Sequence, residues 1–222
     1  MGLGFWDLIT LATLQAIVDV SVSEQAGWAP LDLALAYLDG GARFLQLRAK
    51  SLGSGALLAL AESLVRAAAP YDATVIVNDR ADIARMAGAA GVHLGQDDVS
   101  PSDARRLVGD AAIVGYSTHS VDQIAAALRE PATYIAVGPV FGTRTKETGY
   151  DAVGLELVSK AAAAAAAARR PIVAIGGVTL ATAPQVLAAG ASCVAVISDL
   201  LVDNDPAGRT RAYVQALAQH RV

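Results

Sequence analysis

Three polar side chains near the beginning of the chain have a spacing that could bind an anion. Gln46, Arg48 and Lys50 are each separated by two positions, so in an extended segment they lie on one side of the backbone. Two of the three carry a positive charge, and Arg and Lys are the usual side-chain partners of phosphate groups. The segment therefore predicts an anion-binding site.

Two carboxylates could bring a metal ion to the same anion. Asp79 and Asp98 follow two successive apolar segments. Mg²⁺ usually binds proteins through one or two carboxylates and completes its coordination with phosphate and water. The alternative is that each aspartate caps a helix or carries a solvated loop charge. The cations Arg48, Lys50 and Lys146 favour the metal, because an anion and a metal together would balance all of these charges.

Two segments in the C-terminal half predict a second anion site that needs no metal. Gly176-Gly177 and Ile197-Ser198 each follow an apolar segment. Glycines allow backbone N–H groups to approach a phosphate closely. The alternative is that Gly176-Gly177 is an ordinary turn. The occurrence of both segments at equivalent places favours phosphate binding.

Nearly every apolar segment is followed by a polar group, which a purely structural protein has no reason to show. The remaining examples are Asn78, Ser117, Thr118 and His119, and the Thr143, Arg144, Thr145 and Lys146 of a longer segment at 138–154. His119 is a candidate acid or base. His93 is expected to be a structural residue, and His220 to lie solvated in the tail. The lone Cys193 is expected to be buried and inert, and no pairing of a nucleophile with a histidine base is predicted.

The elements that must position these groups alternate regularly. Short β-branched segments, which we expect to be strands, lie at 14–20, 44–47, 74–77, 91–94, 113–116, 134–137, 172–175 and 193–197. Ala- and Leu-rich segments, which we expect to be helices, lie at 31–39, 55–69, 82–87, 101–108, 121–128, 155–168, 181–189 and 206–219. Strands apolar on both faces are typical of a parallel sheet covered by helices. The pattern predicts a single (β/α)₈ TIM barrel, with the polar groups gathered where the strands end. An open doubly wound sheet is the alternative.

Composition and charge narrow the class of protein. The 222 residues are 54% hydrophobic and 17% charged, with a net charge of −4, so we expect one domain over residues 1–222 and no nucleic-acid partner. Residues 1–13 are an N-terminal extension without an assigned role, and they lack the basic start of a signal peptide. The uncharged segment 172–198 is broken by Gly176, Gly177, Pro184 and Gly190, which argues against a membrane span. A single cysteine excludes a disulfide framework and favours the cytoplasm. A homo-oligomer is left open.

Taken together, these motifs resemble the thiamine phosphate synthase (thiamine-phosphate pyrophosphorylase) family. The segments that carry the resemblance are QLRAK at 46–50, NDR at 78–80, GVHLGQ at 91–96, STH at 117–119, GPVF at 138–141, TRTK at 143–146 and AIGGV at 174–178. They occur in the family's order and spacing, from about Leu14 to Leu201. The resemblance implies a (β/α)₈ barrel that couples a hydroxymethylpyrimidine diphosphate to a thiazole phosphate, with Mg²⁺, and releases diphosphate.

The resemblance also implies a role for individual residues. Contacts to the pyrimidine diphosphate would come from Gln46, Arg48, Lys50, Asn78, Ser117 and Lys146, of which Arg48, Lys50 and Lys146 would be catalytic. Asp79 and Asp98 would hold Mg²⁺. Contacts to the thiazole phosphate would come from Thr143, Thr145, Gly177, Ile197 and Ser198. This chain departs from the family at Ala49, where Glu is frequent, and at Gly142 and Arg144, which replace prolines.

Two other functions are compatible with a barrel of this kind. A thiazole tautomerase would need only the second phosphate site and an acid or base such as His119, but it would leave Asp79, Asp98 and Lys146 without a role. A non-catalytic barrel that binds a thiamine precursor as a regulator would not be expected to retain both the carboxylates and the cations. The synthase is therefore the preferred interpretation.

Overall fold

A computed structural model describes residues 12–142 and 151–219 of the chain. Eight parallel strands form a closed barrel in which β1 pairs with both β2 and β8. The strands are β1 (Leu14–Asp19), β2 (Phe44–Arg48), β3 (Thr74–Asn78), β4 (Gly91–Leu94), β5 (Ile113–Thr118), β6 (Tyr134–Val137), β7 (Ile172–Ile175) and β8 (Cys193–Val196). The closure confirms the predicted (β/α)₈ barrel and excludes the open sheet, in which two edge strands would each pair with one neighbour only.

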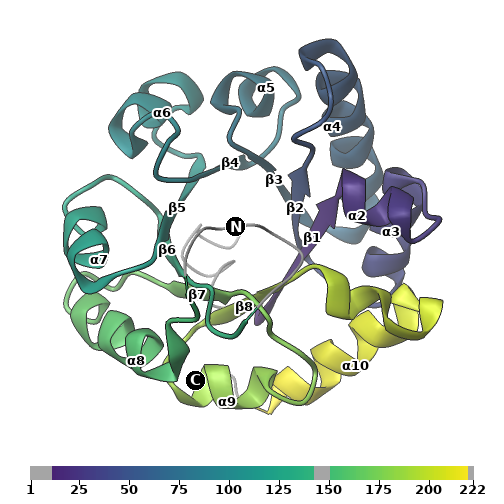
Figure 1. The fold of residues 1–222 in the computed structure, drawn as a ribbon. Helices are drawn as coiled ribbons and strands as arrows, with labels where there is room; N and C mark the ends of the chain where they lie inside the picture. Colours follow the sequence, from purple (N-terminus) through teal and green to yellow (C-terminus); the bar gives the residue numbers. More distant parts are fainter. Residues whose placement is uncertain (1–11, 143–150, 220–222) are drawn as a thin grey trace.

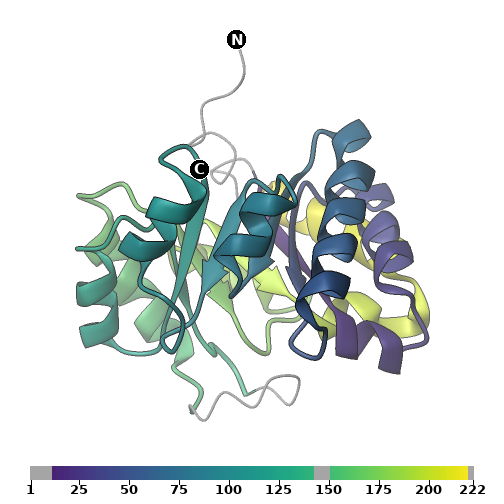
Figure 2. The ribbon, with the colours of Figure 1, turned by 90° about the horizontal axis from the view of Figure 1, so that it is seen from above.

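The helices surround the barrel as an outer layer (Figure 1). They are α2 (Val20–Gln25), α3 (Pro30–Asp39), α4 (Ser54–Ala68), α5 (Ala81–Met86), α6 (Pro101–Val108), α7 (Val121–Ala127), α8 (Gly154–Ala165), α9 (Ala183–Ala188) and α10 (Pro206–Ala218). Two short 3₁₀ helices, η1 (Ala69–Tyr71) and η2 (Ser198–Asn204), complete the described elements. The view from above shows the helices packed along the sides of the tilted strands (Figure 2). No helix in the part of the chain that the structure describes is long and apolar enough to cross a membrane.

The first strand and its neighbourhood differ from the sequence-based prediction. The strand ends at Asp19, one residue early, because the Asp19 carboxylate accepts a hydrogen bond from the Val22 N–H (3.1 Å) and begins helix α2. This six-residue helix is too short to show an apolar period, so it was missed. Thr13, the last residue of the predicted N-terminal extension, contacts the barrel, since its carbonyl accepts a hydrogen bond from the Val194 N–H in β8.

Side chains alternate between the two faces of each strand, as the two-residue period requires. One set, which includes Ile17, Phe44, Ile76, Tyr134 and Val173, fills the inside of the barrel. The other set packs against the helices in a larger apolar layer. The two faces together explain why the strands show no polar alternation in the sequence. Toward the carboxyl ends, the inward positions of β2, β3 and β5 are the polar Gln46, Asn78 and Ser117, whereas those of β6 to β8 stay apolar; both kinds line the site described below.

The inside of the barrel is closed by one large ring. Tyr134 is fully buried, and its ring stacks on His93 and meets Phe44 edge-on, with centroids 5.6 and 6.2 Å away. Gly115 on the neighbouring strand leaves the space that this ring occupies, because a Cβ built there would overlap the phenol. The glycine in β5 is therefore required by close approach, and the apolar strand pattern gives no hint of it.

We expect Gly115→Ala to lower the free energy of unfolding by about 3 kcal/mol or more, since neither the Tyr134 ring nor the strand can move without disturbing the packed interior. Gly55→Ala is the matched control. Gly55 lies in α4 with open space around its Cβ position, so its replacement should be neutral or add about 0.5 kcal/mol. Urea unfolding of both variants measures the difference. Equal stability of the two would mean that Tyr134 does not fill the barrel as described.

Candidate active site

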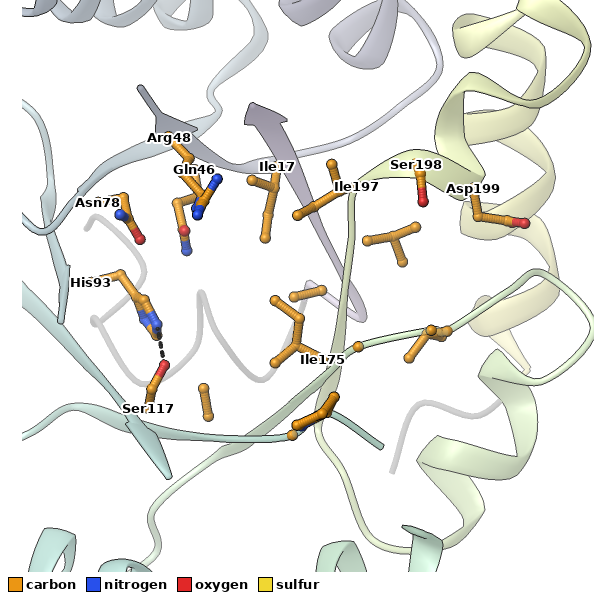
Figure 3. A pocket seen from close by; sticks show the side chains of 18 of the residues that line it. Ile17, Gln46, Arg48, Asn78, His93, Ser117, Ile175, Ile197, Ser198 and Asp199 are labelled. Atoms are coloured by element: carbon orange, nitrogen blue, oxygen red, sulfur yellow. Dashed lines mark hydrogen bonds between the residues drawn. The ribbon is translucent and has the colours of Figure 1, made fainter. Parts of the chain in front are cut away.

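A cavity opens at the carboxyl ends of the strands. It measures about 790 Å³, including the part open to solvent. Seven of the predicted site residues line it: Gln46, Arg48, Asn78, Ser117, Gly177, Ile197 and Ser198. Gln46, Asn78, His93 and Ser117 lie on one side, with Ile175 and Ile197 opposite them (Figure 3). Residues from both predicted anion sites therefore line one cavity.

Arg48 is paired with an acid that sequence analysis did not assign to the site. Asp19 and Arg48 are direct neighbours in the register of β1 and β2, and the Arg48 guanidinium donates to the Asp19 carboxylate. The side chains are 3% and 15% exposed, respectively. The Asp19 carboxylate thus holds the Arg48 guanidinium in one place and partly neutralises its charge, which from the sequence was expected to be unbalanced.

Lys50, Asp79 and Asp98 form a second charged group just outside Asn78. Lys50 Nζ lies 3.4 Å from an Asp79 oxygen, and the backbone N–H of Asp79 donates to His93 O at 2.7 Å. Asp98 accepts from the Gly95 N–H at 2.7 Å. The cavity lining formed by the described residues does not include these three side chains. They lie beside the cavity on the loops after β2, β3 and β4.

The two aspartates are close enough to repel each other. Burial raises the pKa of the Asp98 carboxyl, the Gly95 N–H opposes that rise, and the negative charge of Asp79 adds to it. Two carboxylates held together in this way favour a cation between them. Among residues 12–142 and 151–219, no three His, Cys, Asp or Glu side chains gather as an all-protein metal cage. Two oxygen ligands on adjacent loops suit Mg²⁺, which leaves most of its positions to phosphate and water.

The opposite side of the cavity is made of backbone. Gly176 and Gly177 both have positive φ angles of 101° and 62°, a region that side chains other than glycine avoid. A Cβ on either residue would also meet the segment 139–142 that follows β6. The fold therefore requires glycine at both positions. A structural turn here is compatible with the predicted binding of a phosphate.

Asp199 lines the same side of the cavity and was not predicted. One of its oxygens accepts hydrogen bonds from the Leu180 N–H (3.0 Å), from the Arg209 guanidinium (2.8 Å) and from the Tyr213 hydroxyl (2.6 Å). These bonds join the β8 end to α10 and to the loop before α9. Asp199 therefore holds the Ile197–Ser198 segment in place. No sequence pattern marks this role, because the partners of Asp199 are distant along the chain.

His93 and His119 both line the cavity, so the histidines contribute more to the site than the sequence suggested. His93 was expected to be a structural residue, and both of its ring nitrogens do have partners, but it also lines the cavity. Its Nε2 lies 2.9 Å from Ser117 Oγ, a serine–histidine pair that was not predicted. His119 lines the cavity as well, and its Nδ1 bonds to the carbonyl of Gly138.

Some predicted residues fall outside the described part of the chain. These are Thr143, Arg144, Thr145 and Lys146, together with His220. Cys193 was expected to be buried, and it is, as a free thiol inside the barrel. Burial raises its pKa far above the ordinary range for cysteine, so it stays protonated and unreactive, as predicted.

Comparison with known proteins identifies the family to which this chain is similar. The family model described as thiamine monophosphate synthase matches residues 15–200. The thiamine-phosphate synthase of Roseiflexus castenholzii is 41% identical over 189 residues, which cover 85% of this chain and 82% of that protein. The thiamine-phosphate synthase of Thermus thermophilus is also 41% identical, over 88% of this chain and 94% of that protein.

Solved structures give the same result. The thiamine phosphate pyrophosphorylase from Pyrococcus furiosus superposes with a TM-score of 0.86 at 27% identity, covering 96% of this chain and 98% of that one. A 3-hexulose-6-phosphate synthase shares the fold, with a TM-score of 0.61 at 22% identity. The match of the family model and the two relatives above place this chain, a transferase of thiamine biosynthesis, in the thiamine monophosphate synthase family.

Proposed function

We propose that this chain couples 4-amino-2-methyl-5-(diphosphooxymethyl)pyrimidine to hydroxyethylthiazole phosphate, which yields thiamine phosphate and diphosphate. The observation that carries the proposal is a single cavity with two sides of different chemistry, each suited to an anion. Arg48 stands on one side, and the Gly176–Gly177 and Ile197–Ser198 backbone stands on the other. A reaction between two phosphorylated substrates needs both sides at once.

The pyrimidine diphosphate is assigned to the side near β2 to β5. Its contacts would be Gln46, Arg48, Lys50, Asn78, Ser117 and Lys146. Asp79 and Asp98 would hold Mg²⁺ beside it, which agrees with their close approach and with the raised pKa of Asp98. Bound Mg²⁺ would neutralise charge on the diphosphate, which is what a divalent cation supplies to a leaving phosphate group.

The thiazole phosphate is assigned to the side near β7 and β8. Gly177, Ile197 and Ser198 would contact its phosphate, together with Thr143 and Thr145. Asp199 supports this side through its bonds to Arg209 and Tyr213. The proposal leaves the presence of a carboxyl group on the thiazole open.

The reaction needs charge stabilisation rather than a nucleophilic side chain. The bond between the pyrimidine methylene carbon and the diphosphate oxygen breaks, and both electrons leave with the oxygen. Arg48, Lys50 and Lys146 stabilise the negative charge that grows there, in the place where electrostatic catalysis acts. The electron-rich aminopyrimidine carries the positive charge until the thiazole nitrogen attacks the carbon. Holding both fragments in one cavity supplies much of the remaining rate enhancement.

The direct test is to incubate the purified protein with both substrates and to measure thiamine phosphate and diphosphate. We expect equal amounts of the two products, formed only when Mg²⁺ and both substrates are present. Release of diphosphate without coupling, or no turnover at all, would contradict the proposal. The working environment that we propose is the reducing cytoplasm, with small molecules as the only required partners and the oligomeric state open.

A thiazole tautomerase is the second candidate, and one observation favours it. The Gly138 carbonyl can only accept, so Nδ1 of His119 carries the hydrogen of this bond; in a neutral imidazole of that tautomer, Nε2 is the basic nitrogen. We expect His119→Ala to lower kcat/KM for coupling by less than about tenfold, because ionisation removes no proton from carbon. A tautomerase would lose about 10²–10⁴-fold. Assaying both reactions in both proteins decides between them, and fast isomerisation that is lost with His119 would reverse our ranking.

A further inference from the structure

A column of hydrogen-bonded side chains crosses the barrel beneath the cavity. Gln15 Nε2 lies 3.4 Å from the Tyr134 hydroxyl. That hydroxyl lies 2.8 Å from Nδ1 of His93, and Nε2 of His93 lies 2.9 Å from Ser117 Oγ. The four residues come from β1, β6, β4 and β5. Only the last bond reaches the cavity, where His93 and Ser117 are seen side by side (Figure 3).

The direction of the first bonds follows from what each group can donate. Tyr134 is fully buried, and burial raises the pKa of its hydroxyl far above the ordinary range, so the phenol keeps its one hydrogen. The Gln15 amide nitrogen only donates, so the phenol oxygen accepts from it. The phenol hydrogen, buried with it, needs an acceptor, and the ring nitrogen within reach is Nδ1 of His93 at 2.8 Å, which accepts in the tautomer that carries no hydrogen there.

The direction of the last bond follows from the histidine. A neutral imidazole carries one N–H, and when Nδ1 accepts a hydrogen bond the N–H must be on Nε2. In that tautomer, Nε2 of His93, which lies 2.9 Å from Ser117 Oγ, is the donor of this bond. With its oxygen engaged as an acceptor, Ser117 has its own hydroxyl hydrogen to donate, and Ser117 lines the cavity.

We infer that Tyr134 is a positioning residue, which acts through the tautomer of His93 to turn the Ser117 hydroxyl into a hydrogen-bond donor toward the cavity. The chemical partner that suits such a donor is an anionic oxygen, and on the proposed function, on which this inference rests, it is an oxygen of the departing diphosphate. Aligned hydrogen bonds strengthen one another, so the column would stabilise the charge as it grows. Of the four residues in the column, Ser117 is the one that would contact the diphosphate.

The tautomer can be read without any substrate. In protein labelled with ¹⁵N-histidine, we expect His93 to show an unprotonated Nδ1 and a protonated Nε2. Tyr134→Phe keeps the ring and removes only the hydroxyl, and it should shift both nitrogen signals toward a mixture of tautomers. Tyr37→Phe is the matched control, because the Tyr37 hydroxyl is also buried but has no hydrogen-bond partner among the described residues. It should leave the His93 signals unchanged. A wild-type His93 with its hydrogen on Nδ1 would overturn the inference.

Kinetics separate a positioning role from a packing role. We expect Tyr134→Phe to lower kcat for coupling about tenfold, at the low end of what removal of a supporting hydrogen bond costs, with KM changed by less than about threefold. Tyr37→Phe should have wild-type kcat. In a His93→Gln background the amide can itself donate to Ser117, so Tyr134→Phe should there cost less than about twofold.

Two kinetic outcomes would contradict the inference. One is a wild-type kcat in Tyr134→Phe, and the other is a full tenfold loss that persists in the His93→Gln background. If the wild-type protein fails to couple the two substrates, the proposed function fails. In that case the nitrogen signals still decide the direction of the hydrogen bonds in the column, because they are measured on the protein without substrate.

Discussion

Asp79→Asn and Asp98→Asn should each lower kcat for coupling by about 10²-fold or more, because each removes one of the two charged oxygen ligands proposed for Mg²⁺. The fold should not suffer. Asparagine tolerates the positive φ of 65° at position 79. At position 98 the loss of charge relieves the repulsion from Asp79. We therefore expect unchanged or slightly higher stability together with a large loss of activity.

The control for this prediction is the neighbouring acid Asp97, which is exposed. Asp97→Asn removes the same charge one residue away and should keep wild-type turnover. Initial rates over a range of Mg²⁺ concentrations, with thermal unfolding of each variant, provide the measurement. If the Asp79 and Asp98 variants match the wild type at limiting Mg²⁺, the metal assignment is wrong.

Arg48→Gln should lower kcat/KM for coupling by about 10²–10³-fold, because the lost guanidinium is the half-buried cation that lines the side of the cavity assigned to the diphosphate. The same change should lower the free energy of unfolding by roughly 2–3 kcal/mol. It leaves Asp19, which is 3% exposed, without its ion-pair partner. The loss is at the low end for a broken buried pair, since Asp19 keeps its bond to the Val22 N–H.

The double variant Asp19→Asn/Arg48→Gln separates the two effects. With both charges removed, no buried carboxylate is left without a partner. The free energy of unfolding should therefore return to within about 1 kcal/mol of the wild type. Activity should stay low because the cation is still missing. Denaturant unfolding and steady-state kinetics on the three variants test this. Recovery of activity in the double variant would show that Arg48 serves only to satisfy Asp19.

Much of the barrel could be predicted from the sequence because its causes are local. Apolar β-branched segments alternating with Ala- and Leu-rich ones specify strands and helices by side-chain period. Their number specifies a (β/α)₈ barrel, and β2 to β8 lie within a residue or two of the predicted bounds. The rule that active sites lie at the carboxyl ends of the strands then selected Gln46, Asn78 and Ser117, all of which line the cavity.

What the sequence could not show are the contacts between distant strands. Asp19 and Arg48 are 29 residues apart and meet because the register of β1 and β2 places them opposite each other. Gln15 and Tyr134 are 119 apart and meet because closure of the barrel brings their inward faces together. No local pattern marks Asp19 as the partner of an arginine.

The same reason explains the space that Gly115 leaves for Tyr134. Sequence alone indicated the strand residues Gln46, Asn78 and Ser117 as facing the site, because that depends on the two-residue period of each strand. Only the tertiary structure decided which of them touch, because that depends on the register of neighbouring strands and on how the barrel interior is filled.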